Sequence, residues 1–274
     1  MSVNGHNVQN RNSVAVVDII ERDSGVLLSL EDAESHEFLR SRSRTLVISN
    51  GKPPTDACLS LLKWLALGTM VIDHINTYLL SGLHEWMSVI GRVSMPLFVY
   101  VLGCNLARHK MREQRRSVYA RTAKRLLICA SIATVPYVAL NDLAAGWWPL
   151  NFVFSLLAGT LTIAAFDSTS KWRLVIVLVV VAWFGAVTDY WWPPIIACLA
   201  VWSYYRDGKG FKLLIFAACL MMIYATNRNW WALCAIPMII LAQKWRYTLP
   251  RAQLFFYLFY PLHFYVFWGL KLLR

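Results

Sequence analysis

The stretch Lys63–Leu80, "KWLALGTMVIDHINTYLL", is apolar over nearly its whole length, yet it carries two adjacent ionisable residues, Asp73 and His74, well inside it. An apolar run of this length is typical of a transmembrane helix. A charged side chain near the bilayer centre costs roughly 2.5–3.5 kcal/mol even on insertion scales, so such residues face a bundle interior and often carry function. The stretch therefore predicts a membrane helix that takes part in chemistry.

The rest of the chain belongs to the same class. Of its 274 residues, 58% are hydrophobic and 15% are charged, whereas soluble domains are about 45–50% apolar and about 25% charged. We therefore expect an all-α, polytopic helical bundle in a membrane. The net charge of +12 lies largely in short segments between apolar runs, so it does not indicate nucleic-acid binding. The six cysteines show no disulfide or metal-ligand spacing, and no metal is expected.

The chain divides into two regions at a proline-containing linker, "SNGKPPTD" (Ser49–Asp56). Residues 1–56 are polar, and we expect them to be cytoplasmic and either disordered or one surface helix. Residues 57–274 form the predicted transmembrane domain, with about nine spans; eight or ten remain open because the middle spans are short. The expected spans are 57–80, 84–106, 122–140, 150–166, 173–188, 190–205, 211–225, 229–243 and 252–273.

The positive charges predict the orientation. With a cytoplasmic N-terminus, the inner segments hold sixteen Lys and Arg residues and the outer segments hold three. Cytoplasmic loops of membrane proteins carry the excess of these residues. The N-terminus is thus expected inside, in a multi-pass protein of a bacterial inner membrane.

Three polar residues of the first hairpin lie at one depth. The hairpin turns at Ser81–Glu85, Asp73 and His74 come seven or eight residues before this turn, and Arg92 comes seven after it. At the helical rise, all three lie roughly 10–12 Å below the outer surface. We expect an ion pair between Asp73 and Arg92 that faces the bundle interior. The alternative is that this pair only holds two helices together.

Further polar residues are candidates for the same site. His263 lies near the midplane of the last span, and with His74 it offers a general base in a partly dry cavity, although it could simply be a packed residue. Lys63 is nearly in register below His74, or it extends to the membrane surface. Asn151 supplies an amide donor or caps its helix.

These residues lie in sequence motifs that are similar to those of a known family. "LKWLALGTMVIDHIN" (Leu62–Asn76), then "IGRVSMPLFVYVLGCNLARH" (Ile90–His109) and the closing "FYPLH" (Phe259–His263) resemble the TraX-type pilin acetylases, membrane proteins encoded by conjugative plasmids. That family is similar in plan to the wider membrane acyltransferases. The resemblance covers residues 58–273 in span order, and its most specific parts are the first two spans and the last.

The resemblance implies acetyl transfer from acetyl-CoA to the N-terminal amine of the major pilin subunit. Pilin and membrane lipids are then the partners, and nucleic acid is not one. The implied catalytic residues are Asp73, His74, Arg92 and His263. His74 would act as general base, Arg92 with Asn151 would polarise the thioester carbonyl, and Asp73 would hold Arg92. His263 would be a second proton carrier or a gate.

The basic segment Arg108–Arg125 would then hold the CoA phosphates with its arginine forks. The candidate donor-binding residues are Lys63, Arg108, Arg112, Arg115 and Arg116. The alternative is that this segment only sets topology and binds anionic lipid head groups.

Two other classes of function remain open. One is a transporter or proton-coupled carrier in which Asp73, His74 and His263 form a relay. The other is a non-enzymatic scaffold for pilin insertion. No two-fold repeat of the kind that transporters carry is visible in the chain.

Overall fold

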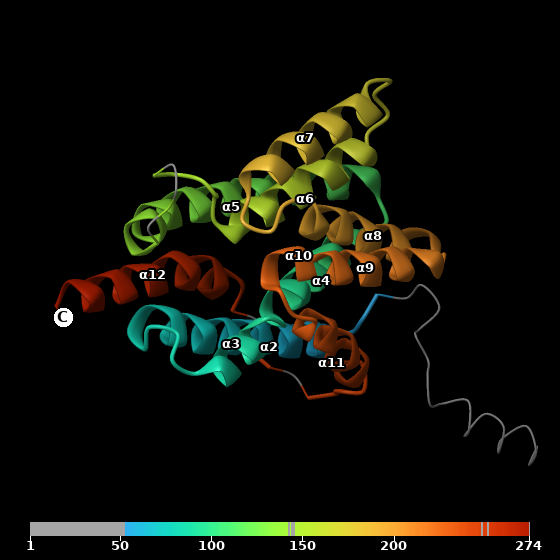
Figure 1. Ribbon diagram of the computed structural model, residues 1–274. Helices are drawn as coiled ribbons and strands as arrows, with labels where there is room; N and C mark the ends of the chain where they lie inside the picture. The colour runs from blue at the N-terminus through green and yellow to red at the C-terminus, as the bar shows by residue number, and fades with distance from the viewer. Residues whose placement is uncertain (1–52, 142, 144–145, 248, 251, 274) are drawn as a thin grey trace, which may run out of the picture. The chain divides into compact units, whose positions relative to one another are not determined.

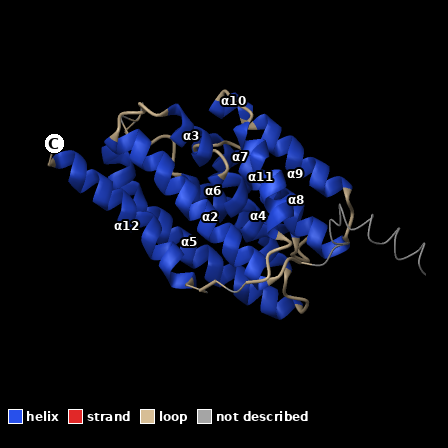
Figure 2. Ribbon diagram, turned by 90° about the horizontal axis from the view of Figure 1, so that it is seen from below, coloured by secondary structure: helices blue, strands red, loops and turns tan. Residues whose placement is uncertain are grey.

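The computed structural model describes residues 53–273, apart from residues 142, 144, 145, 248 and 251. Within this range the chain is helical, and the nearest approach to a sheet is a single bridge between Leu150 and Thr188 (Figure 2). The expected all-α class is confirmed. The prediction for residues 1–56 falls on residues that lie, except for the last four, outside the described part.

The described residues contain nine helical segments in the order of the nine predicted spans (Figure 1). Four of the segments are built from two pieces each. The segments are α2 Asp56–His74 with the π-helix η2 Ile75–Leu79, α3 Glu85–Gly91 with α4 Ser94–Ala107, α5 Arg112–Leu140, α6 Phe152–Phe166, α7 Arg173–Val187, α8 Pro193–Asp207, α9 Phe211–Met222 with α10 Tyr224–Asn227, the 3-10 helix η3 Trp231–Cys234 with α11 Ala235–Ala242, and α12 Gln253–Leu272.

Three of these segments, Asp56–Leu79, Glu85–Ala107 and Arg112–Leu140, are long and apolar enough to cross a membrane. Four others are apolar but shorter, in keeping with the short middle spans that the sequence predicts. Helix α7 buries only Gly185, and it exposes large apolar side chains such as Trp183, which is 67% exposed. Such a surface suits lipid contact and would be costly in water.

One predicted boundary is wrong. The basic segment Arg108–Arg125 was expected as a loop before a span that begins at residue 122, but α5 begins at Arg112. The stretch "REQRRSVYARTAKR" (Arg112–Arg125) contains no Gly or Pro and is rich in Arg, Glu, Gln and Lys, which favour helix. The basic residues are therefore held on a rigid helical extension, and only residues 108–111 link the two helices.

An ion pair ties this extension to α6. The Arg115 guanidinium donates from Nε to Asp167 Oδ2 at 2.7 Å and from Nη2 to Asp167 Oδ1 at 3.0 Å. Both side chains are largely buried. A two-point arginine–carboxylate bond fixes orientation as well as distance, so it sets how the basic end of α5 lies against the end of α6.

The helices pack so that α4 lies between α2 and α8, while α12 runs along α5 (Figure 2). A glycine allows α4 and α8 to pack closely. A Cβ atom on Gly103 of α4 would lie 2.8 Å from Val201 Cγ1 of α8, closer than real contacts allow. The space between α2, α4, α5, α6 and α12 holds the cavity described below.

We expect Arg115→Ala to lower the free energy of unfolding by about 3 kcal/mol, because it leaves the Asp167 carboxylate without its partner in a largely buried position. Thermal unfolding of the purified protein in detergent or nanodiscs measures this change. The matched control is Arg116→Ala, which removes the exposed neighbouring cation and should change stability by no more than about 0.5 kcal/mol. Equal effects of the two substitutions would contradict a structural role for the Arg115–Asp167 pair.

Candidate active site

The two membrane histidines meet. His74, the last residue of α2, places Nδ1 2.8 Å from Nε2 of His263 in α12, and the two rings are nearly parallel. Nδ1 of His263 lies 3.1 Å from the carbonyl oxygen of Phe259. The rings of Tyr78 and Phe264 pack around His74. A chain of hydrogen bonds thus runs from one helix to another through an aromatic surrounding.

A local widening of the first span follows His74 directly. Residues Ile75–Leu79 form a π-helix, a feature that often marks functional sites. Asn76 within it is fully buried, and its amide donates to His84 O at 2.8 Å and to Ser88 Oγ at 3.0 Å. Its Oδ1 accepts from the His84 backbone N–H. This amide therefore holds α3 against the end of α2.

Arg92 lies at the junction of α3 and α4 and is only partly satisfied by the protein. Its Nη1 donates to Asn227 Oδ1 at 3.2 Å. Its Nε is buried and has no hydrogen-bond partner among the described residues. Because a buried donor without an acceptor is costly, this atom is suited to an acceptor on a bound molecule.

The expected ion pair between Asp73 and Arg92 is not formed. In residues 53–273 as described, the ion pairs within 4.0 Å are Arg108–Asp56, Arg115–Asp167 and Lys212–Asp207. Arg92 is a charged neighbour of Asp73 at longer range.

The reason is the packing of α3 on α2. A Cβ atom on Gly91 would lie 2.3 Å from Cβ of Asp73, so the Asp73 side chain occupies the place where a larger residue of α3 would stand. There it interacts with Ser88 instead. Helical rise predicted one level for the two charged residues, but it does not give the direction of a side chain, and that of Asp73 is limited by the contact with Gly91.

Two residues that the sequence pattern did not indicate stand beside Arg92. Asp189 and Tyr190 lie in the loop between α7 and α8, both partly buried. Burial raises the pKa of Asp189 to about 6, while the charge of Arg92 opposes this rise. Tyr190 interacts with Arg92 through its hydroxyl. A single acidic residue in "AVTDYWWPP" (Ala186–Pro194) was the only available signal, and nothing in it pointed to a residue about a hundred positions away.

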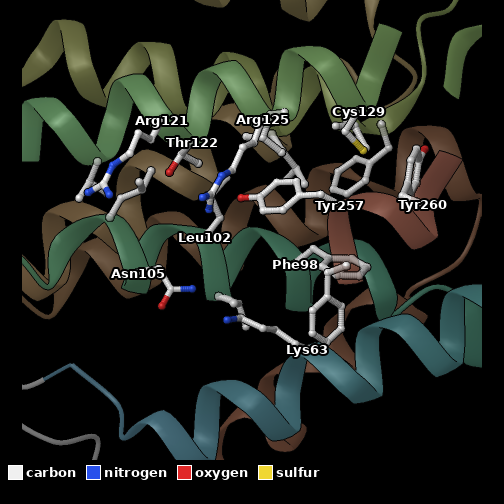
Figure 3. Close-up of a pocket in the computed structure, with 18 of the residues that line it drawn as sticks. Lys63, Phe98, Leu102, Asn105, Arg121, Thr122, Arg125, Cys129, Tyr257 and Tyr260 are labelled. Atoms are coloured by element: carbon white, nitrogen blue, oxygen red, sulfur yellow. The ribbon is translucent and has the colours of Figure 1, made fainter. Parts of the chain in front are cut away.

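A cavity of about 550 Å³ opens below the histidines, between α2, α4, α5, α6 and α12. Lys63 from α2 and Arg125 from α5 extend toward the same space from opposite sides (Figure 3). Met70 and Tyr260 also line it. These two residues come one helical turn, about 5 Å, before His74 and His263, so the cavity leads from a basic rim toward the histidine pair.

The candidate donor-binding residues separate into two groups. Lys63 and Arg108 line the cavity, although Arg108 also pairs with Asp56. Three others do not line it: Arg112 donates to Asp167 O, Arg115 is held by the Asp167 carboxylate, and Arg116 is exposed.

Arg121 and Arg125 take the place of these three at the rim. Both belong to the basic segment, but neither was singled out. Their i, i+4 spacing puts them on one face of a helix, which would have been a signal if the segment had been taken as helical.

Asn151 caps its helix, α6, which was the alternative to its expected role as an amide donor in the site. Its Oδ1 accepts from Val153 N at 3.2 Å, as an N-cap does. Its amide nitrogen donates to Ala130 O and to Thr134 Oγ1. With its amide engaged on both sides, Asn151 is not placed to polarise a substrate carbonyl.

Asp189 gives a pH-dependent stability that can be measured. Its folded-state pKa of about 6 lies above the ordinary value near 3.9, so stability is full below about pH 4 and declines as pH rises through about 6. We expect Asp189→Asn to remove this decline. Relative to the wild type, the free energy of unfolding of the variant should rise by up to about 3 kcal/mol as pH increases from about 4 to about 6. Parallel pH dependences of the two proteins, followed by thermal unfolding, would contradict burial of the ionisable group.

Comparison with known proteins identifies the family of this chain. The family model described as TraX protein matches residues 58–271. Two curated relatives, both named Protein TraX, come from Escherichia coli and from Escherichia coli strain K12. They are 28% and 27% identical to this chain over 165 residues, or 60% of it. The aligned region spans 62% of the length of each relative. No solved structure matches. The family match covers the membrane segments and every residue of the site, and the chain belongs to the TraX family.

Proposed function

We propose that this protein is a membrane acetyltransferase of a bacterial inner membrane, which moves an acetyl group from acetyl-CoA to the N-terminal amine of a conjugative pilin subunit. The observation that carries the proposal is the cavity with a basic rim that ends one turn from the histidine pair. With the N-terminus in the cytoplasm, the rim faces the side where CoA is found. The histidine pair then lies toward the side on which a processed pilin terminus emerges.

The rim suits the phosphates of CoA. Lys63, Arg121 and Arg125 approach it from two helices, and arginine forks and lysine ammonium groups are the usual phosphate ligands. The deeper walls are apolar and include Leu67 and Phe98. A thin, extended thioester arm could pass along them and bring its carbonyl to the level of His74.

The transfer step needs a base and an electrophilic partner. The amine nitrogen attacks the thioester carbonyl carbon, the new C–N bond forms, and the C–S bond breaks. His74 takes the proton that the amine nitrogen loses and returns it to the departing CoA thiolate. Arg92 offers its unpartnered Nε to the oxyanion, where a preorganised donor in a dry site is effective.

The acceptor would arrive as an ammonium, which first releases one proton to water and then attacks as the neutral amine. The outer end of the site is suited to receive it. Asp73 and Asp189 both lie near Arg92, from two different parts of the chain. Two carboxylates around one guanidinium leave negative charge available for a second cation. These residues would attract the pilin terminus and orient it.

The intact mass of mature pilin co-expressed with this protein is the direct test. We expect a gain of one acetyl group with the wild type and none with His74→Ala, because the base is removed. Leu262→Ala is the control, since this residue of α12 is 60% exposed and adjacent to the site only in sequence. Unmodified pilin with the wild type would exclude acetylation of that pilin. Proton flux would then indicate a carrier, and changed pilin abundance alone would indicate a scaffold.

The donor rim has its own test in a matched pair of arginines on α5. We expect Arg125→Glu to raise the KM for acetyl-CoA by about tenfold, the effect of losing one charge-assisted phosphate contact worth about 1.4 kcal/mol, with little change in kcat. Arg116→Glu makes the same change of charge on the same helix, away from the cavity. If both variants raised KM equally, the basic residues would act only through general charge, as a lipid-binding or topology-setting segment does.

A further inference from the structure

The proposed function leaves open which histidine, and which of its two nitrogens, acts as the base. Three groups connected by hydrogen bonds decide this assignment. They are the Phe259 carbonyl, the His263 ring and the His74 ring. We propose that His263 is a positioning residue that sets the tautomer of His74, so that Nε2 of His74 is the nitrogen that accepts the substrate proton. This inference rests on the proposed function for the identity of the substrate, but its first test does not.

The chain of hydrogen bonds has a direction because its first member can only accept. A carbonyl oxygen carries no proton, and the Phe259 oxygen lies 3.1 Å from Nδ1 of His263. That nitrogen must therefore hold the ring proton. In a neutral imidazole the other nitrogen is then the acceptor, so Nε2 of His263 presents a lone pair.

The second link follows in the same way. Nε2 of His263 lies 2.8 Å from Nδ1 of His74, a hydrogen-bond distance that requires one proton between the two atoms. Since Nε2 of His263 accepts, Nδ1 of His74 donates. The remaining nitrogen of His74, Nε2, carries the lone pair. The opposite assignment would bring the lone pairs of His263 Nδ1 and the Phe259 oxygen together.

The two residues differ in how many ring nitrogens the hydrogen-bond chain uses. His263 is 6% exposed, and it stacks on Phe259 and contacts Tyr260 and Phe264. His74 is more exposed than this. Both ring nitrogens of His263 take part in the hydrogen-bond chain. His74 uses only Nδ1 in this chain and so retains Nε2 for a substrate.

The same arrangement stabilises the charge that forms during transfer. When Nε2 of His74 takes the amine proton, the ring becomes an imidazolium whose Nδ1–H points at a lone pair. The positive charge is thereby held by a strong hydrogen bond in a region of low dielectric constant. When Nε2 returns the proton to the CoA thiolate, both rings regain their starting state.

The first experiment measures the tautomer directly. Nitrogen-15 NMR of ring-labelled histidine in the purified full-length protein, in lipid bilayers at neutral pH, with His74→Ala and His263→Leu spectra for assignment, reports which nitrogen is protonated. We expect His74 to carry its proton on Nδ1, and His263→Leu to abolish this preference. A His74 protonated on Nε2 in the wild type would overturn the proposal whether or not the protein acetylates anything.

The second experiment separates positioning from mere packing. His263→Gln keeps a side-chain acceptor that can reach Nδ1 of His74, whereas His263→Leu fills the space without one. We expect the glutamine variant to keep acetylation within about tenfold of the wild type and the leucine variant to lose about a hundredfold or more in kcat, with similar KM for acetyl-CoA. Equal loss in both variants would overturn the proposal. Absence of acetylation in the wild type would instead overturn the proposed function, and the tautomer measurement would then decide alone.

Discussion

Lipid offers no hydrogen-bond partners, so every polar group at membrane depth must find its partner inside the protein. This constraint accounts for most of the site. His74 pairs with His263, Arg92 with Asn227, and Asn76 with His84 and Ser88. Among the described residues, five buried side-chain atoms lack a hydrogen-bond partner, and the Nε of Arg92 is one of them. In a region where satisfaction is the rule, an unsatisfied donor is a reasonable place to look for a bound acceptor.

The order of the helices could be predicted from the sequence because the length of hydrophobic segments is a strong signal in membrane proteins. The nine helical segments of the described residues follow the expected order, and helical rise alone predicted that Asp73, His74 and Arg92 lie at one depth. What rise does not give is the direction of a side chain. The contact of Gly91 with Asp73 turned the carboxylate away from a direct bond to Arg92, and this required knowing how two helices cross.

Other features were beyond sequence pattern for a related reason. Asp189 joins the site through a loop that follows a helix with almost no buried face, so no periodicity marked it. The pairing of His74 with His263 joins residues 189 positions apart, and the motifs named both residues without indicating that their rings touch. Arg121 and Arg125 were missed because a basic segment between apolar runs was taken as a loop, although its composition favours helix.

The helical form of that segment also decides what its cations can do. Arg115 and Arg125 are ten residues apart on one rigid helix, so they differ in height by about 15 Å and in direction by about a quarter turn. Arg115 meets Asp167 at the end of α6 and is used in holding the helix, whereas Arg125 meets the cavity and the face of Tyr257. A flexible loop could exchange these roles, but a helix anchored at Arg115 cannot. The Arg115–Asp167 ion pair therefore keeps the arginines of the rim in position below the histidine pair.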